Sequence, residues 1–138
     1  MPDYLDQLSR VSLFKGASHK ELAEISKVTT EVSIEPGTAL VEQGAQAREA
    51  FVILSGEGEV TVDGKPVATL GPGDCVGEIA LLDKGPRSAS VVATTPIEAL
   101  VLDPREFNSL LLNVPAIAVK VAAALAARVR ELDTKLYG

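Results

Sequence analysis

A chain of 138 residues has the size of one domain and is long enough to bury a hydrophobic core. Its balance of 46% apolar and 23% charged residues excludes an intrinsically disordered chain. The net charge of -6 argues against broad nucleic-acid binding, and no apolar run approaches the ~20 residues that a membrane span needs.

The first residues and the cysteine content bear on the cellular compartment. Residues 1–10 carry acids and lack the basic segment followed by an apolar one that marks a signal peptide. The single cysteine, Cys75, excludes an internal disulfide and fits a reducing compartment. We therefore expect a cytoplasmic protein with no membrane partner.

Residues 1–27 are predicted to be helical. Pro2–Ser9 is typical of one short helix, and Ser18 followed three residues later by Glu21 has the spacing of a capping box. The apolar residues that come next at helical spacing should pack inward. The only histidine, His19, should lie exposed in the first turn of this second helix. One histidine cannot form a His-based metal cluster, so no metal site is expected.

Residues 28–103 change to short strands separated by turn residues. Thr38–Gln43 and Ala50–Leu54 are predicted to be buried strands, and Glu59–Asp63 alternates like a half-exposed one. Tight turns are expected at Glu35–Thr38, Asp63–Gly64 and Leu70–Asp74. No helix intervenes between strands, as a parallel sheet would need. The predicted class is mainly β with flanking helices, an antiparallel β-roll of the jelly-roll or double-stranded β-helix type.

Residues 104–136 are predicted to form two helices. Asp103 followed by Pro104 gives an acid at the cap and proline at the first helical position. A break at Asn113–Pro115 separates the first helix from a second, Ala116–Leu136. The second helix carries apolar residues at heptad-like spacing, namely Leu125, Val129, Leu132 and Leu136. Two interpretations stay open: this stripe packs on the β-roll, or it pairs with a second copy of the chain.

The stretch Gly77–Ser90 combines features that suit a small phosphodiester with a ribose. Gly77 has no Cβ, so a ligand can approach the backbone closely. A helical turn starting at Glu78 would leave amides free to donate to an anion. Arg87 adds a planar donor fork that matches phosphate oxygens, and the Glu78 carboxylate suits a ribose hydroxyl.

This stretch resembles the phosphate-binding cassette of the cyclic nucleotide-binding domain family, which includes catabolite activator proteins and kinase regulatory subunits. The cassette reads G-E-(aliphatic)-(small)-L-L, a gap, then P-R-(Ser/Thr/Ala)-A. Matching positions here are Gly77, Glu78, Ile79, Ala80, Leu81, Leu82, Pro86, Arg87, Ser88 and Ala89. Motifs of the family's β-roll also correspond, at Pro36-Gly37, Gly44, Phe51–Gly56 and Leu70–Asp74.

The resemblance implies that the cassette holds the sugar and phosphate while the terminal helix closes over the base. The ligand-binding residues that it implies are Gly77, Glu78, Ile79, Ala80, Arg87, Ser88 and Ala89, with Leu132 and Thr134 from the helix. The implied ligand is cyclic AMP, or cyclic GMP, without a metal. Ser88 also occurs in family members that prefer cyclic AMP, so we expect that preference.

The family's transcription factors carry a helix-turn-helix after the long helix, whereas this sequence stops at Gly138. We therefore expect residues 1–138 to be a single binding domain that does not bind DNA by itself. Its output would pass to an effector domain or protein, or through a homodimer formed by the terminal helix.

Three classes of function compete. The first is a cyclic nucleotide receptor that moves its terminal helix, and the second is a structural or protein-interaction domain of the same fold without ligand. The intact pair of Glu78 and Arg87 argues against the second, because degenerate copies should lose it. The third is a cupin-type enzyme, which would need clustered metal ligands that the chain lacks. We therefore expect a binding protein and no enzyme.

Overall fold

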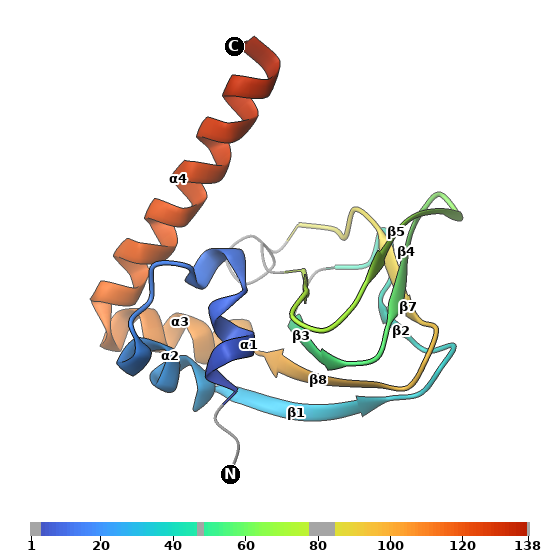
Figure 1. Ribbon diagram of the computed structural model, residues 1–138, viewed down its shortest axis with the longest axis horizontal. Helices are drawn as coiled ribbons and strands as arrows, with labels where there is room; N and C mark the ends of the chain where they lie inside the picture. The colour runs from blue at the N-terminus through green and yellow to red at the C-terminus, as the bar shows by residue number, and fades with distance from the viewer. Residues whose placement is uncertain (1–3, 47–48, 78–84, 138) are drawn as a thin grey trace.

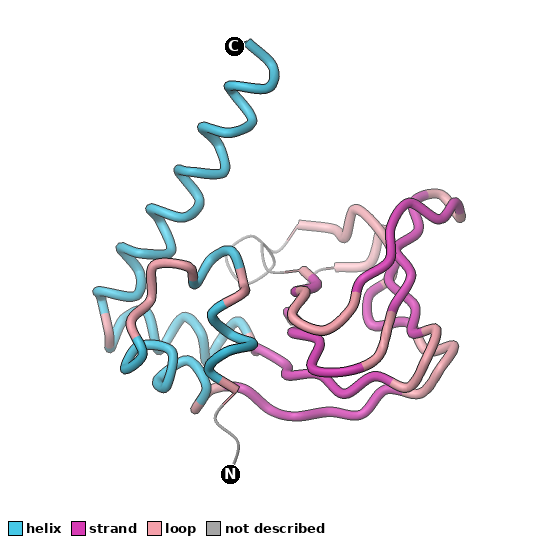
Figure 2. Tube along the Cα trace, viewed as in Figure 1, coloured by secondary structure: helices cyan, strands magenta, loops and turns pink. Residues whose placement is uncertain are grey.

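The computed structural model describes residues 4–46, 49–77 and 85–137, and for residues 132–137 it describes the helical backbone alone. A group of helices lies on one side and a β-roll on the other, and a long terminal helix projects from the helical side (Figures 1 and 2). The predicted class, mainly β with flanking helices at both ends, is confirmed.

The N-terminal part contains α1 (Leu5–Ser9), η1 (Ser12–Phe14) and α2 (His19–Ser26). The predicted capping box is present: Glu21 N donates to Ser18 Oγ at 3.2 Å, and Ser18 N donates to Glu21 Oε1 at 2.8 Å. His19 is exposed in the first turn, as expected. The first helix is shorter than predicted, because Tyr4 has a left-handed backbone with φ of 52° and cannot continue it. Pro2 lies outside the described residues.

The described strands form two antiparallel four-stranded sheets, ordered β1-β8-β3-β6 and β2-β7-β4-β5. The first sheet contains β1 (Thr29–Ile34), β3 (Ala50–Ser55), β6 (Cys75–Val76) and β8 (Ile97–Leu102). The second contains β2 (Ala39–Val41), β4 (Gly58–Val62), β5 (Lys65–Leu70) and β7 (Ser90–Ala93). The strand β6 lies at the edge of the first sheet, and its Cys75 is half-buried against the helical core.

The three predicted turns are present. Gly37 (φ 87°) forms the first, where Thr38 N donates to Glu35 O at 3.1 Å. Asp63 and Gly64 both have positive φ, the type I′ geometry that matches the twist of a hairpin. In the third turn, Asp74 N donates to Gly71 O at 3.0 Å.

The strand predicted at Thr38–Gln43 is shorter in the structure, covering Ala39–Val41, and only Val41 of the three is buried. Its register against β7 is irregular, and the chain leaves the sheet at Gly44, whose φ is 84°. A sequence pattern does not show this because the departure depends on a partner strand about 50 residues away.

Two apolar clusters form the core. One joins the helices to the first sheet and includes Phe14 and Phe107, whose ring centroids are 5.8 Å apart. The other fills the β-roll around Ile53, Val91 and Ile97. Because the two clusters are distinct, the roll has an interior of its own beside the helical part.

At the C-terminal end lie α3 (Pro104–Asn113) and α4 (Pro115–Tyr137), which are bent by 113° relative to each other at the predicted break. Asp103 caps α3 by accepting from Arg105 N at 2.8 Å. Ile117 and Val121 bury the first turns of α4 against the helical core. No single described helix is long and apolar enough to cross a membrane; α3 and α4 up to Glu131 would pass only as a bent pair, by length and composition.

Candidate functional site

The loop that precedes β7 carries Arg87, and its backbone is paired with the loop that follows β2. Arg87 N donates to Ala45 O at 2.8 Å, and Gly44 N donates to Arg87 O at 2.9 Å. A bridge between Gln46 and Pro86 extends this pairing. Both backbone hydrogen-bonding groups of Arg87 are therefore engaged, which fixes the point from which its side chain departs.

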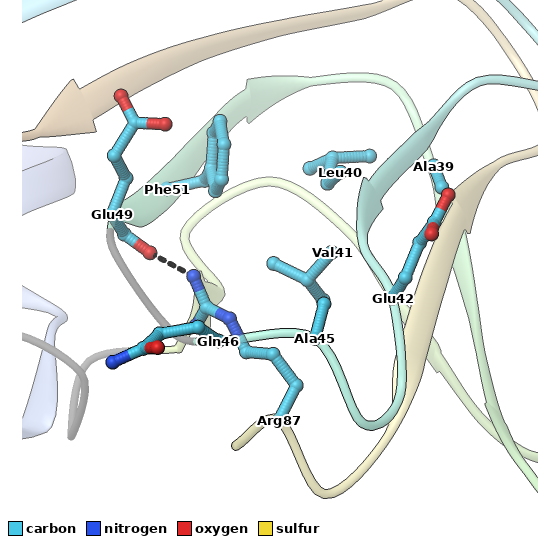
Figure 3. A pocket seen from close by; sticks show the side chains of 9 residues that line it. All are labelled: Ala39, Leu40, Val41, Glu42, Ala45, Gln46, Glu49, Phe51 and Arg87. Carbon is cyan, nitrogen blue, oxygen red and sulfur yellow. Dashed lines mark hydrogen bonds between the residues drawn. The ribbon is translucent and has the colours of Figure 1, made fainter. Parts of the chain in front are cut away.

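The Arg87 side chain lies against Gly77. Its Nη2 donates to the backbone carbonyl of Glu49 (Figure 3). A Cβ on Gly77 would overlap Arg87 Nη1 and lie 3.0 Å from Cζ, and the φ of Gly77 is 73°. Both the backbone conformation and the close approach of the guanidinium therefore require glycine at position 77. The structure thus brings together two of the predicted site residues.

Beside Arg87 lies an open hollow of about 270 Å³. Its lining residues come from β2, β3, the segment between them and the loop before β7, namely Ala39, Leu40, Val41, Glu42, Ala45, Gln46, Glu49, Phe51 and Arg87. Figure 3 shows Val41 and Phe51 on the side of the hollow nearer the guanidinium, and Leu40 farther from it. The hollow therefore offers a cation and apolar walls together, which suits a ligand with an anionic part and a flat apolar part.

The guanidinium keeps its charge in this position. Burial lowers the pKa of Arg87, and the nearby Glu49 carboxylate partly opposes that effect. The ordinary pKa of arginine lies so far above neutrality that the group remains a cation at pH 7. A guanidinium has five N–H donors, and among the described residues Arg87 uses Nη2 to donate to the Glu49 carbonyl. A guanidinium with this set of donors suits an anion in the hollow.

The other predicted cassette residues divide into two groups. Ser88 is exposed and Ala89 half-buried, and both follow Arg87 on the way into β7. Glu78, Ile79 and Ala80 lie outside the described residues. The proposed contact of Glu78 with a ribose therefore stays a prediction.

The predicted helix residues Leu132 and Thr134 belong to the part of α4 whose backbone alone is described. The preceding part of α4 is attached to the N-terminal segment: Lys120 Nζ lies 2.6 Å from Glu21 Oε1, and Arg128 Nη1 donates to Ser12 Oγ at 3.3 Å. In Figure 1 the far half of α4 extends away from the β-roll. The structure does not bring α4 to the hollow at Arg87, and a role for Leu132 and Thr134 stays a prediction.

Sequence reasoning missed several residues of the hollow. Phe51 was expected to belong to the core, and it does pack against the cluster inside the roll, but it is half-buried and also lines the hollow. Its position between buried Ala50 and Val52 indicates that it faces the other side of β3. Glu49 contributes through its backbone carbonyl, which no side-chain pattern reveals. Among the described residues, no group of His, Cys, Asp or Glu could hold a metal ion.

Comparison with known proteins identifies the family. The family model of the cyclic nucleotide-binding domain matches residues 31–113, which contain the β-roll from the third residue of β1 onward, the Arg87 hollow and α3. The chain belongs to the cyclic nucleotide-binding domain family. The fold agrees with that of the N-terminal domain of a transcriptional regulator from Streptomyces coelicolor A3(2), with a TM-score of 0.89, 26% sequence identity and coverage of 96% of both chains.

Two relatives show the settings in which similar domains occur. The Pycsar effector protein XpPycTIR of Xanthomonas perforans is 38% identical over 117 residues, which cover 83% of this domain and 39% of the effector. A CRP-like cAMP-activated global transcriptional regulator of Mycobacterium tuberculosis is 27% identical over 134 residues, 94% of this domain and 60% of the regulator. The chain thus spans less than two thirds of the length of either relative.

Proposed function

We propose that this domain binds a cyclic nucleotide in the hollow at Arg87 and prefers cyclic AMP. The observation that carries the proposal is the half-buried guanidinium of Arg87, held over Gly77 at the edge of an open hollow with apolar walls. In this arrangement Arg87 binds the cyclic phosphate, and Gly77 leaves the space that the guanidinium needs. The apolar side chains of Leu40, Val41 and Phe51 contact the sugar or base.

The remaining cassette residues complete the proposed site. Glu78 accepts a hydrogen bond from the ribose, and backbone amides of Ile79 and Ala80 donate to the phosphate, as the family resemblance implies. Ser88 directly after Arg87 also occurs in family members that prefer cyclic AMP, and we propose the same preference here. The similar regulator of Mycobacterium tuberculosis is described as cAMP-activated, which supports the same preference.

The test is calorimetric titration of the purified domain with cyclic AMP and cyclic GMP side by side. Arg87→Ala should weaken binding by about tenfold to a hundredfold, because hydrogen bonds to charged groups contribute about 1.5–3 kcal/mol. Arg87→Lys keeps the charge but loses the planar fork of donors. Its affinity should therefore lie between that of the unmodified domain and that of Arg87→Ala. Unchanged affinity for cyclic AMP in a folded Arg87→Ala variant would show that the nucleotide does not bind at Arg87. Cyclic GMP bound about tenfold more tightly would reverse the preference.

We further propose that the ligand controls the position of α4, whose far part closes over the base with Leu132 and Thr134. A ligand shifts an equilibrium only if it binds one state better, and contacts made only in the closed state provide that difference. Deleting the residues after Arg128 should leave a folded roll that binds more weakly. Saturating nucleotide should protect the amides of residues 128–137 against hydrogen exchange. If exchange there is the same with and without ligand, α4 is not a lid.

The output of the domain is proposed to be regulatory, through an effector or a second copy of the chain. Val119 and Val129 of α4 are 69% and 58% exposed. Together with Ala122 and Ala126, they are spaced alternately three and four residues apart, as in a coiled coil. This stripe lies on the face of α4 opposite the buried Ile117. A second α4 from another copy would cover this face.

A further inference from the structure

The side chain of Gln43, just after β2, is bonded to the tip of the β4–β5 hairpin. Its Nε2 donates to Asp63 Oδ1 at 3.0 Å, and its Oε1 accepts from Asp63 N at 2.8 Å. Both polar groups of the amide are thus directed to one residue, 20 positions along the chain. Asp63 occupies the first turn position with φ of 52°, which this pair of bonds helps to maintain.

The backbone that begins at Gln43 is hydrogen-bonded to Arg87 and to the start of β7. Gln43 N donates to Ser90 Oγ at 2.8 Å, at the start of β7. The next residue, Gly44, donates from N to Arg87 O at 2.9 Å, and Ala45 O accepts from Arg87 N at 2.8 Å. Segment 43–45 therefore holds the backbone of Arg87 at both its polar groups and holds β7 three residues later.

We propose that Gln43 is a positioning residue for Arg87, acting through the loop that it ties to the hairpin tip; this inference rests on the proposed function. The loop after β2 is exposed from Glu42 to Gln46, so apolar packing contributes little to its placement. The bonds of the Gln43 amide to Asp63 contribute to its placement, in addition to its backbone pairing with residues 86 and 87. A guanidinium binds a phosphate well only in the right orientation, so small shifts of its backbone reduce affinity.

A purely structural role would have a different signature. Gln43 and Asp63 are both exposed, so their side chains bury little apolar surface, and hydrogen bonds made in contact with solvent contribute little to the free energy of unfolding. The main consequence of losing them should appear at the phosphate contact. Binding of a nucleoside without phosphate, such as adenosine, should not depend on Gln43.

The experiment compares Gln43→Ala with Asp63→Asn, which keeps the side-chain oxygen and tolerates positive φ in the turn. Gln43→Ala should weaken binding of cyclic AMP about fivefold, as expected for loss of well-oriented hydrogen bonds. It should leave adenosine binding, followed by NMR titration, unchanged. Asp63→Asn should bind like the unmodified protein. In an Arg87→Ala background, Gln43→Ala should have no further effect on cyclic AMP.

A second measurement needs no ligand. In the free protein, Gln43→Ala should accelerate hydrogen exchange at the Gly44 and Arg87 amides, while amides of β8 keep their protection. Equal cyclic AMP affinity and unchanged exchange would overturn the inference, as would an equal loss for adenosine and cyclic AMP. If the unmodified protein does not bind cyclic AMP, the proposed function fails, and the exchange comparison still decides whether Gln43 positions Arg87.

Discussion

Substituting Gly77 by alanine should separate ligand binding from folding at this site. The new Cβ would overlap Arg87 Nη1, which is the far end of a flexible side chain and can move aside. Moving it breaks the bond to the Glu49 carbonyl and turns the guanidinium away from the hollow. We therefore expect a loss of affinity for cyclic AMP together with the loss of stability that a non-glycine residue at this φ causes.

The magnitudes follow from the two kinds of change. A left-handed backbone costs a non-glycine residue about 1–2 kcal/mol, so the unfolding free energy should fall by that amount. Loss of a charge-assisted contact to phosphate contributes about 1.5–3 kcal/mol, so affinity should fall about tenfold to a hundredfold. Calorimetry measures the affinity, and denaturant unfolding followed by circular dichroism measures the stability.

Gly37→Ala is the matched control. Gly37 has a similar φ of 87°, but an added Cβ would meet nothing within 4 Å. Gly37→Ala should lose the stability that the positive φ alone costs, and it should keep its affinity. Gly77→Ala should cost little more affinity once Arg87 is alanine, because its effect passes through the guanidinium. If Gly77→Ala binds cyclic AMP as tightly as Gly37→Ala does, the contact between Gly77 and Arg87 is not what sets affinity.

Three further predictions concern other parts of the domain. The hydrogen bond from Lys120, and then that from the Ser18 amide, lower the pKa of Glu21. Glu21 therefore stabilises the fold above its ordinary value of 4.5, and the difference in melting temperature between the unmodified protein and Glu21→Gln should vanish as the pH falls below it. Phe51→Ala should weaken binding of cyclic AMP and of cyclic GMP by about the same factor. A change in the preference between these two nucleotides without weaker binding of both would contradict its role as an apolar wall. Val119→Asp should abolish self-association in sedimentation equilibrium; an unchanged dimer would exclude this face of α4.

Features determined by neighbouring residues could be predicted from the sequence. The capping box at Ser18, the cap at Asp103 and the hairpin turn at Asp63 each depend on a few residues and on backbone preferences. The class of fold followed from the density of such turns. The cassette motif also indicated Gly77 and Arg87 as site residues, and the structure places them in contact.

Features that depend on distant segments could not be predicted. The carbonyl of Glu49 reaches Arg87 because β3 and the loop before β7 are adjacent, and a backbone oxygen leaves no trace in a residue pattern. The link between Gln43 and Asp63 likewise depends on two loops that only the folded roll brings together. The early end of β2 arises from its irregular pairing with β7.

The position of α4 is the hardest feature to predict, and the reason bears on its proposed role. Leu125 and Val129 look like one heptad stripe, yet Leu125 packs against the helical core while Val129 is 58% exposed. The helix thus has an apolar face on either side, and burying one leaves the other free. Its side-chain bonds to the N-terminal segment, through Lys120 and Arg128, are of the partly exposed kind that contribute little to stability. The buried Ile117 and Val121 hold the first turns of α4 in the helical core, so the movement that we propose concerns the later turns. In that proposal, a nucleotide moves these turns only if it binds one of their positions more tightly than the other.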